Sequence, residues 1–144
     1  MKKVLFGLFA VVFLVMSIGS VAAVPLKAAP YKNFPEHLYL FEKDPVTWQV
    51  VDGGAWGKLN VAKGVFNGHG LEPGVCYSLY SEAEWGITMT FMGSDVADGC
   101  GNVHISSDVV ATGKVWLVLT DDVTCDKMTG WNPTEYLFEY NILP

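Results

Sequence analysis

The sequence predicts an all-β domain built as an antiparallel β-sandwich of about seven to eight strands. Short runs rich in Val, Leu, Trp, Tyr and Phe alternate with clusters of Gly, Pro, Asn and Asp, as strands alternate with turns in such folds. Within several runs the apolar residues fall at every second position, which gives a strand one inward face. Beyond the N-terminal segment no run has helical periodicity.

The first 23 residues have the layout of a secretory signal peptide. Two lysines precede an uncharged apolar run from residue 4 to residue 16, and small residues follow at Ser20–Ala23. This order is typical of a segment that is removed on export, and we expect cleavage after Ala23 or Ala22. A retained N-terminal anchor is the alternative, because about 20 apolar residues suffice to span a bilayer. We therefore expect a secreted or cell-surface protein, without membrane contact once the signal is cleaved.

The rest of the chain is expected to form one domain. Residues 24–36 contain several prolines and predict an extended lead-in, and residues 37–144 have the length of a single β-domain with one core. The chain has 15 acidic residues against nine basic ones, all of them lysines, and a formal net charge of −6. Nucleic acid is therefore not expected as a partner, because phosphate backbones are bound by clustered Lys and Arg.

The candidate strands follow from the apolar runs and the turn residues between them. They are His37–Phe41, Val46–Val51, Lys58–Phe66, Val75–Ser81, Gly86–Met92, Asn102–Ser107, Lys114–Thr120 and Glu135–Ile142. The run Lys114–Thr120 is apolar on both faces, which predicts a central strand that is covered twice or that carries a contact surface. In the last strand we expect Tyr136 and Phe138 on the inward face. The tetrapeptide Tyr-Leu-Phe-Glu occurs at residues 39–42 and 136–139; chance can produce this, or the first and last strands can lie side by side.

The segment Gly70–Leu79, Gly-Leu-Glu-Pro-Gly-Val-Cys-Tyr-Ser-Leu, resembles the Leu-x-Pro-Gly-x-x-Tyr-x-Leu corner of fibronectin type III and other immunoglobulin-like sandwiches. Pro73 presets φ for a turn and Gly74 accepts positive φ. Tyr77 can bury its ring while its hydroxyl bonds to the corner backbone. The resemblance implies an immunoglobulin-like sandwich, and fold alone does not imply function.

A second resemblance covers more of the chain. Its segments are Lys43–Trp48, Gly54–Lys58, Phe66–Leu71, Gly101–Ile105, Val115–Leu119 and Gly130–Tyr136. Together they resemble an uncharacterised family of small exported β-domains associated with methanogenic archaea. The resemblance implies export and an all-β fold, and it transfers no catalytic residue.

Three cysteines lie in the part expected to be exported, where disulfides form. One bridge and one odd thiol is the simplest outcome. Cys125 lies in a polar loop, where a covalent link is useful, so we expect it to pair with Cys76 or Cys100.

The tryptophans are the main candidates for a binding site. Trp48 and Trp116 lie within predicted strands and are expected in the core. The candidate ligand-binding residues lie instead in loops or turns: Trp56, His69, Trp85 and Trp131. Exposed aromatic rings bind sugars or protein partners through large rigid surfaces. The structural alternative is that the loop tryptophans close the open ends of the sandwich and that His69 packs against a strand.

Oxygen-bearing side chains in two loops are candidates for a calcium site. They are Asp95, Asp98, Asn102, Asp121, Asp122 and Asp126. The spacing departs from the EF-hand loop, and solvated turns explain it equally well. The histidines and cysteines lack the short spacings of structural zinc. We therefore expect no cofactor, with calcium as the open alternative.

The sequence favours a binding or structural module over an enzyme. The sequence contains no nucleophile elbow of the Gly-x-Ser-x-Gly type. Glu82 and Glu84 could be the paired carboxylates of a glycoside hydrolase, but that reaction needs a cleft that so short a chain can barely enclose. We expect a non-catalytic module that engages a protein or glycan at the cell surface through loop aromatics. The alternative is a small secreted hydrolase or metal-dependent enzyme that uses the Asp-rich loops.

Overall fold

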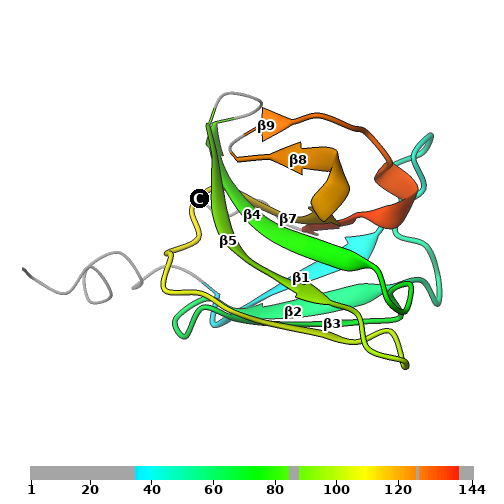
Figure 1. The fold of residues 1–144 in the computed structure, drawn as a ribbon, viewed down its shortest axis with the longest axis horizontal. Coiled ribbons are helices and arrows are strands. Elements are labelled where there is room, and N and C mark those ends of the chain that lie inside the picture. The colour runs from blue at the N-terminus through cyan, green and yellow to red at the C-terminus, as the bar shows by residue number, and fades with distance from the viewer. Residues whose placement is uncertain (1–34, 85–87, 126, 140–144) are drawn as a thin grey trace, which may run out of the picture.

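The computed structural model describes residues 35–84, 88–125 and 127–139 (Figure 1). The expected signal peptide, most of the lead-in and Trp85 and Asp126 lie outside these residues. The described residues form β-strands and two short 3-10 turns, so the expected all-β class is confirmed.

Eight of the strands pair in one antiparallel sheet in the order β5-β4-β7-β10-β1-β2-β3-β6. Their bounds are β1 His37–Glu42, β2 Trp56–Asn60, β3 Val65–His69, β4 Cys76–Glu84, β5 Thr88–Val96, β6 Val103–Ser106, β7 Lys114–Leu119 and β10 Leu137–Glu139. The hairpin of β8 (Val123–Thr124) and β9 (Lys127–Met128) forms a second small sheet. The turns are η2 Thr120–Asp122 and η3 Pro133–Glu135.

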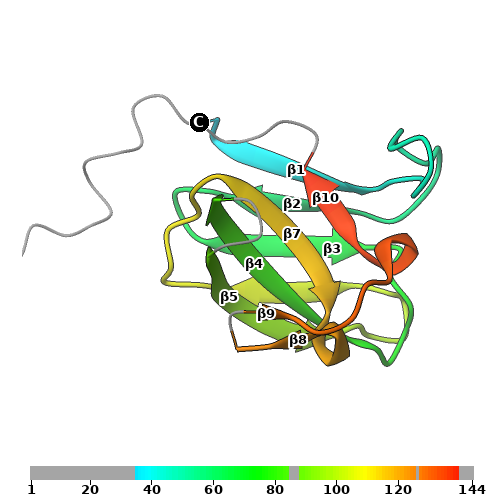
Figure 2. The same ribbon diagram turned by 90° about the horizontal axis from the view of Figure 1, so that it is seen from above.

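The large sheet curls until it is nearly a barrel (Figures 1 and 2). At the seam the Asp95 carboxylate accepts a hydrogen bond from the His104 backbone amide at 2.7 Å, joining β5 to β6 through a side chain. Gly93 has φ 152°, and a Cβ added there would lie 2.6 Å from Ile105 Cγ2. The bare glycine thus lets the two edge strands approach each other.

The core lies inside the curl. Its fully buried members come from seven of the eight strands, namely Leu40, Leu59, Phe66, Leu79, Ile105, Val115, Leu117 and Leu137. Each alternates with an outward residue, which confirms the expectation that Val103 and Ile105 face inward while His104 faces out. Tyr77 is buried too, and its hydroxyl accepts a hydrogen bond from the Glu72 amide at 3.2 Å.

Two candidate strands differ from the structure. Val46–Val51 is not a strand, because Asp44 Oδ1 accepts hydrogen bonds from the Val46 and Thr47 amides at 2.9 and 2.7 Å and closes a turn instead. Lys58–Phe66 is two strands, split by a turn in which Gly64 has φ 66°. The other described candidate strands are present with shifted ends.

The first and last strands lie side by side, as the repeated tetrapeptide suggested. Phe41 in β1 is directly opposite Phe138 in β10. The prediction that Tyr136 and Phe138 face inward is wrong. Leu137 joins the core cluster inside the curl, whereas Tyr136 and Phe138 belong to a second, aromatic cluster. Both faces of β10 are covered, so alternation alone could not tell them apart.

The three cysteines are unpaired, so the expected bridge from Cys125 to Cys76 or Cys100 is not formed. The Tyr80 hydroxyl donates to the Cys125 carbonyl at 2.9 Å, which places the β8–β9 turn over that part of β4. Cys76 lies four residues before Tyr80 in β4, which is about 13 Å along a strand. The turn that carries Cys125 therefore contacts β4 away from Cys76, whereas the Cα atoms of a disulfide lie within about 7 Å of each other. Cys100 belongs to a separate turn, after β5.

The thiols are expected to differ in reactivity. Cys100 and Cys125 are exposed, whereas Cys76 is half-buried and accepts a hydrogen bond from the Thr120 hydroxyl at 3.2 Å. Iodoacetamide should therefore label Cys100 and Cys125 in the native protein and Cys76 fully only after unfolding in urea. Peptide mass spectrometry measures this, and the mass deficit of a disulfide in non-reduced protein would contradict it.

Candidate binding site

An aromatic row crosses the outer face of the large sheet. Directly opposite residues of antiparallel strands share a face, and the register places one ring after another in this position. From β5 to β3 the aromatic row consists of Phe91, Tyr80, Trp116, Phe138, Phe41, Trp56 and His69. Ring centroids are 5.5 Å apart for Tyr80 and Phe91, 5.2 Å for Trp116 and Phe138, and 4.7 Å for Trp56 and His69.

Two loop tryptophans cover the middle of the aromatic row. Trp48 packs edge-on against Phe138 at 5.4 Å, and Trp131 lies 6.1 Å from Trp116 and 6.4 Å from Phe138. The two loop rings are 6.5 Å apart. Trp116 and Phe138 are buried beneath them, whereas Trp48 is 46% exposed and Trp131 is 50% exposed.

The surface continues across β1 and β2. Trp56 is 39% exposed and Tyr39 is 42% exposed, and Tyr39 stacks on Phe41 at 6.4 Å. Phe41 lies opposite both Phe138 and Trp56, so it connects the loop tryptophans to this part of the row. We call the exposed rings Tyr39, Trp48, Trp56 and Trp131 the aromatic surface.

A turn holds Trp48 outward. The Asp44 carboxylate bonds to the Val46 amide and to the Thr47 amide and hydroxyl, and the Trp48 amide donates to the Asp44 carbonyl at 2.8 Å. The hydrogen bonds from Thr47, followed by that from Val46, lower the pKa of Asp44. Trp48 has φ 58°, a left-handed conformation that costs a bulky residue about 1–3 kcal/mol. The expectation that Trp48 lies in the core is therefore wrong.

A buried network holds Trp131. The Tyr136 hydroxyl donates to Asp122 Oδ2 at 2.6 Å, and Asn132 Nδ2 donates to Asp122 Oδ1 and Oδ2 at 3.1 and 2.8 Å. The Gly130 amide bonds to the Asp122 carbonyl at 3.0 Å. Burial, followed by the hydrogen bond to Asp122, raises the pKa of Tyr136. Trp131 is thus fixed on both sides along the chain.

A second network holds His69 beside Trp56. Its Nδ1 lies 2.8 Å from Asn102 Oδ1, and Asn102 Nδ2 donates to both Asp98 carboxylate oxygens at 3.2 Å. Asp98 Oδ1 also accepts from the Asn102 and Cys100 amides at 2.9 and 2.8 Å. Hydrogen bonds from Asn102, then from Cys100, lower the pKa of Asp98.

The structure brings some of the sequence-derived candidates together. Trp56 and His69 are in contact, and Trp131 lies over the same aromatic row. Trp85 lies outside the described residues. Tyr39 and Trp48 are the surface residues that sequence reasoning missed. The Asp-Pro-x-Thr turn signal at residues 44–47 was the clue to the loop position of Trp48.

The acidic candidates for calcium are engaged otherwise. Asp95 caps the His104 amide, Asp98 closes its own turn, and Asp122 binds Tyr136 and Asn132. Asp121 is exposed, and Asp126 lies outside the described residues. Within the described part of the chain no three His, Cys, Asp or Glu side chains are grouped so as to hold a metal ion.

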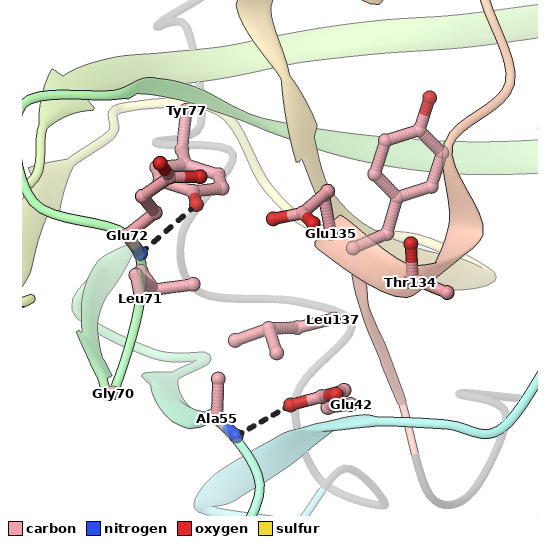
Figure 3. Close-up of a pocket in the computed structure, with 10 residues that line it drawn as sticks. Glu42, Ala55, Gly70, Leu71, Glu72, Tyr77, Thr134, Glu135 and Leu137 are labelled. Atoms are coloured by element: carbon pink, nitrogen blue, oxygen red, sulfur yellow. Dashed lines mark hydrogen bonds between the residues drawn. The ribbon is translucent and has the colours of Figure 1, made fainter.

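A cavity of about 260 Å³ opens at the end of the sheet near Glu42 (Figure 3). Its lining includes three glutamates, Glu42, Glu72 and Glu135, together with Tyr77 and Thr134. Glu42 Oε2 accepts a hydrogen bond from the Ala55 amide at 2.9 Å. Burial raises the pKa of Tyr77, and the nearby Glu135 and Glu72 carboxylates add to this.

Comparison with known proteins returned no matching family model, curated protein or solved structure. In the part of the chain that the structure describes, no helix has the length and apolar character needed to cross a bilayer.

Proposed function

We propose that this protein is an exported, non-catalytic binding module of the cell surface or medium, and that the aromatic surface is its contact face. The observation that carries the proposal is the exposure of four large rings that lie over, in or beside a single aromatic row. Export rests on the signal-peptide layout of the first 23 residues.

The core does not require the exposed rings, because smaller side chains could replace them without leaving it unfilled. The interior of the curl is filled by other side chains, and a large exposed aromatic patch is typical of an interaction site. The strained backbone of Trp48 supports the same conclusion, because conformations of this kind concentrate at functional positions. Tyr and Trp also supply much of the binding energy at protein contact sites.

The immunoglobulin-like sandwich is also a proposal. The hydrogen bond of Tyr77 to the corner backbone supports it. A solved structure of the exported form would test it by the pairing of the edge strands, since a sandwich requires two separate sheets.

The binding role predicts a large loss when the aromatic surface is removed. A triple variant, Trp48→Ala, Trp56→Ala and Trp131→Ala, should bind cell-envelope preparations of the source organism at least about tenfold more weakly than the wild type. Retention of labelled protein on the envelopes measures this. Phe91→Ala is the matched control, because Phe91 belongs to the same row and is 48% exposed but lies on β5, away from the surface. Equal retention of the wild type, the triple variant and Phe91→Ala would contradict the proposal.

A further inference from the structure

We infer that the outer face of β1, β2 and β3 binds a neutral polysaccharide, with Trp56 as the stacking ring and His69 Nε2 as an acceptor for a sugar hydroxyl. The inference rests on the proposed function and names the ligand class of the same surface. It is carried by the hydrogen-bond network that orients His69 beside an exposed tryptophan.

The network decides which ring nitrogen of His69 carries the proton. Asn102 Nδ2 faces the Asp98 carboxylate, so the amide oxygen of Asn102 must point the other way, toward His69. An amide oxygen only accepts, so His69 Nδ1 donates to it. In the neutral imidazole the other nitrogen, Nε2, is then an acceptor. No hydrogen bond joins Nε2 to another of the described residues, and His69 is only half-buried.

Trp56 supplies the apolar part of the site. Its ring lies 4.7 Å from His69 at an interplanar angle of 41°, and its β1 neighbour Phe41 stacks on Tyr39. The CH-bearing face of a pyranose ring is flat and apolar, and it packs on rings of this kind while its hydroxyls stay at the edge. The imidazole that carries Nε2 is in contact with this ring.

The polar neighbours also suit hydroxyl groups. Beside the aromatic row lies a second row of outward-facing residues, formed by Tyr39, Lys58, Asn67 and His104. Lys58 lies over the Tyr39 ring at 5.9 Å, and His104 Nδ1 is 2.7 Å from Asn67 Oδ1. Lys58 can donate a hydrogen bond to a sugar hydroxyl, and His69 Nε2 can accept one from a sugar hydroxyl, because a hydroxyl is both a donor and an acceptor.

The negative charge around this face opposes acidic glycans, although Lys58 lies on it. Asp95 and Asp98 border it, and the whole chain has a formal net charge of −6. A sulfated or carboxylated chain would therefore be repelled at low ionic strength. The ligand class is a neutral chain of pyranoses.

The first test uses four soluble probes, hydroxyethylcellulose, galactomannan, xylan and, as the acidic control, dextran sulfate, in affinity gel electrophoresis. We expect at least one neutral probe to retard the wild-type protein and dextran sulfate to leave it unretarded. Trp56→Ala and His69→Phe should each weaken the association constant about tenfold, and Phe91→Ala should leave it unchanged. His69→Gln, which keeps an acceptor, should bind better than His69→Phe, which keeps only the ring. Circular dichroism confirms that each variant is folded.

The second test measures the positioning role of Asn102 without any ligand. Nitrogen-15 chemical shifts of the His69 ring should show Nδ1 protonated in the wild type. Asn102→Ala should shift the ring toward a mixture of tautomers, whereas Asn67→Ala, beside His104, should leave His69 unchanged. A His69 ring protonated at Nε2 in the wild type would overturn the inference.

The two proposals can fail separately. If none of the neutral probes retards the wild type, and if protease treatment but not periodate oxidation of envelopes abolishes retention, the partner is a protein. The glycan inference is then wrong and the binding module stands. If retention on polysaccharide depends on Trp48 and Trp131 but not on Trp56 or His69, the assigned subsite is wrong. If the triple variant binds envelopes as the wild type does, both proposals fall.

Discussion

Replacing Asp122 by alanine should lower the free energy of unfolding by about 3 kcal/mol. The change leaves the buried Tyr136 hydroxyl without its acceptor, which costs about 1–3 kcal/mol. It also removes the hydrogen bonds between the exposed Asn132 amide and the carboxylate, each worth about 1 kcal/mol. Urea unfolding followed by circular dichroism measures the loss. The variant should also loosen the segment that follows Trp131, because the Asp122 carboxylate binds Asn132, whereas the Gly130 amide keeps its bond to the backbone carbonyl of residue 122.

The neighbouring residue offers a matched control for this prediction. Asp121 is exposed, so Asp121→Ala should change stability by less than about 0.5 kcal/mol. Tyr136→Phe should remove part of the same network, and its effect should not add to that of Asp122→Ala, because the two residues share one hydrogen bond. The buried network would be refuted by equal stabilities of the two Asp variants.

Replacing Glu139 by glutamine should raise the free energy of unfolding above neutral pH by up to about 3 kcal/mol. The gain is about 1.4 kcal/mol for each unit by which the pKa of Glu139 in the folded chain exceeds its pKa in the unfolded chain. Glu139 is buried, and its Oε2 has no hydrogen-bond partner among the described residues. Burial raises its pKa from 4.5 to about 7, against the lowering effects of its own amide and of Lys114 and Lys43. Lys43 donates instead to the Glu139 carbonyl, at 2.9 Å.

The sign of the pH dependence follows from the raised pKa. Below pH 4.5 the carboxyl is protonated in both the folded and the unfolded chain, so wild type and Glu139→Gln should be equally stable. As the pH rises toward 7 the unfolded chain ionises first, and the wild type loses stability that the variant keeps. Urea unfolding at pH 4 and pH 8 measures this. Glu72→Gln, at an exposed position, should follow the wild type, and a constant difference between Glu139→Gln and wild type at both pH values would contradict the prediction.

The parts of the fold that local patterns encode could be predicted. Alternation placed Val103 and Ile105 inside and His104 outside, and the doubly apolar run of β7 correctly indicated a strand covered on both faces. The repeated Tyr-Leu-Phe-Glu segment pointed to the pairing of β1 with β10. In each case the information lies within a few neighbouring residues, because the period of a strand is local.

The candidate site was predictable only in part. The loop position of Trp131 was visible in the sequence, whereas Trp56 and His69, expected in a loop and a turn, belong to β2 and β3. All three residues lie at the aromatic row. Trp48 was not, because a Val-x-Trp-x-Val alternation looks like a strand until the hydrogen bonds of Asp44 are known. The bridge expected for Cys125 failed for a related reason: proximity of two cysteines depends on where a distant hairpin docks.

By itself the sequence determined an all-β chain, the alternation of its strands and the aromatic residues available for a surface. Only the tertiary structure decided that seven of these side chains, from seven strands, form one row, that Trp48 and Trp131 cover its middle, and that Asn102 orients His69 toward Trp56. The physical reason is that register is set between strands far apart in the chain. A shift of one residue in any of these pairings would turn a ring to the opposite face of the sheet.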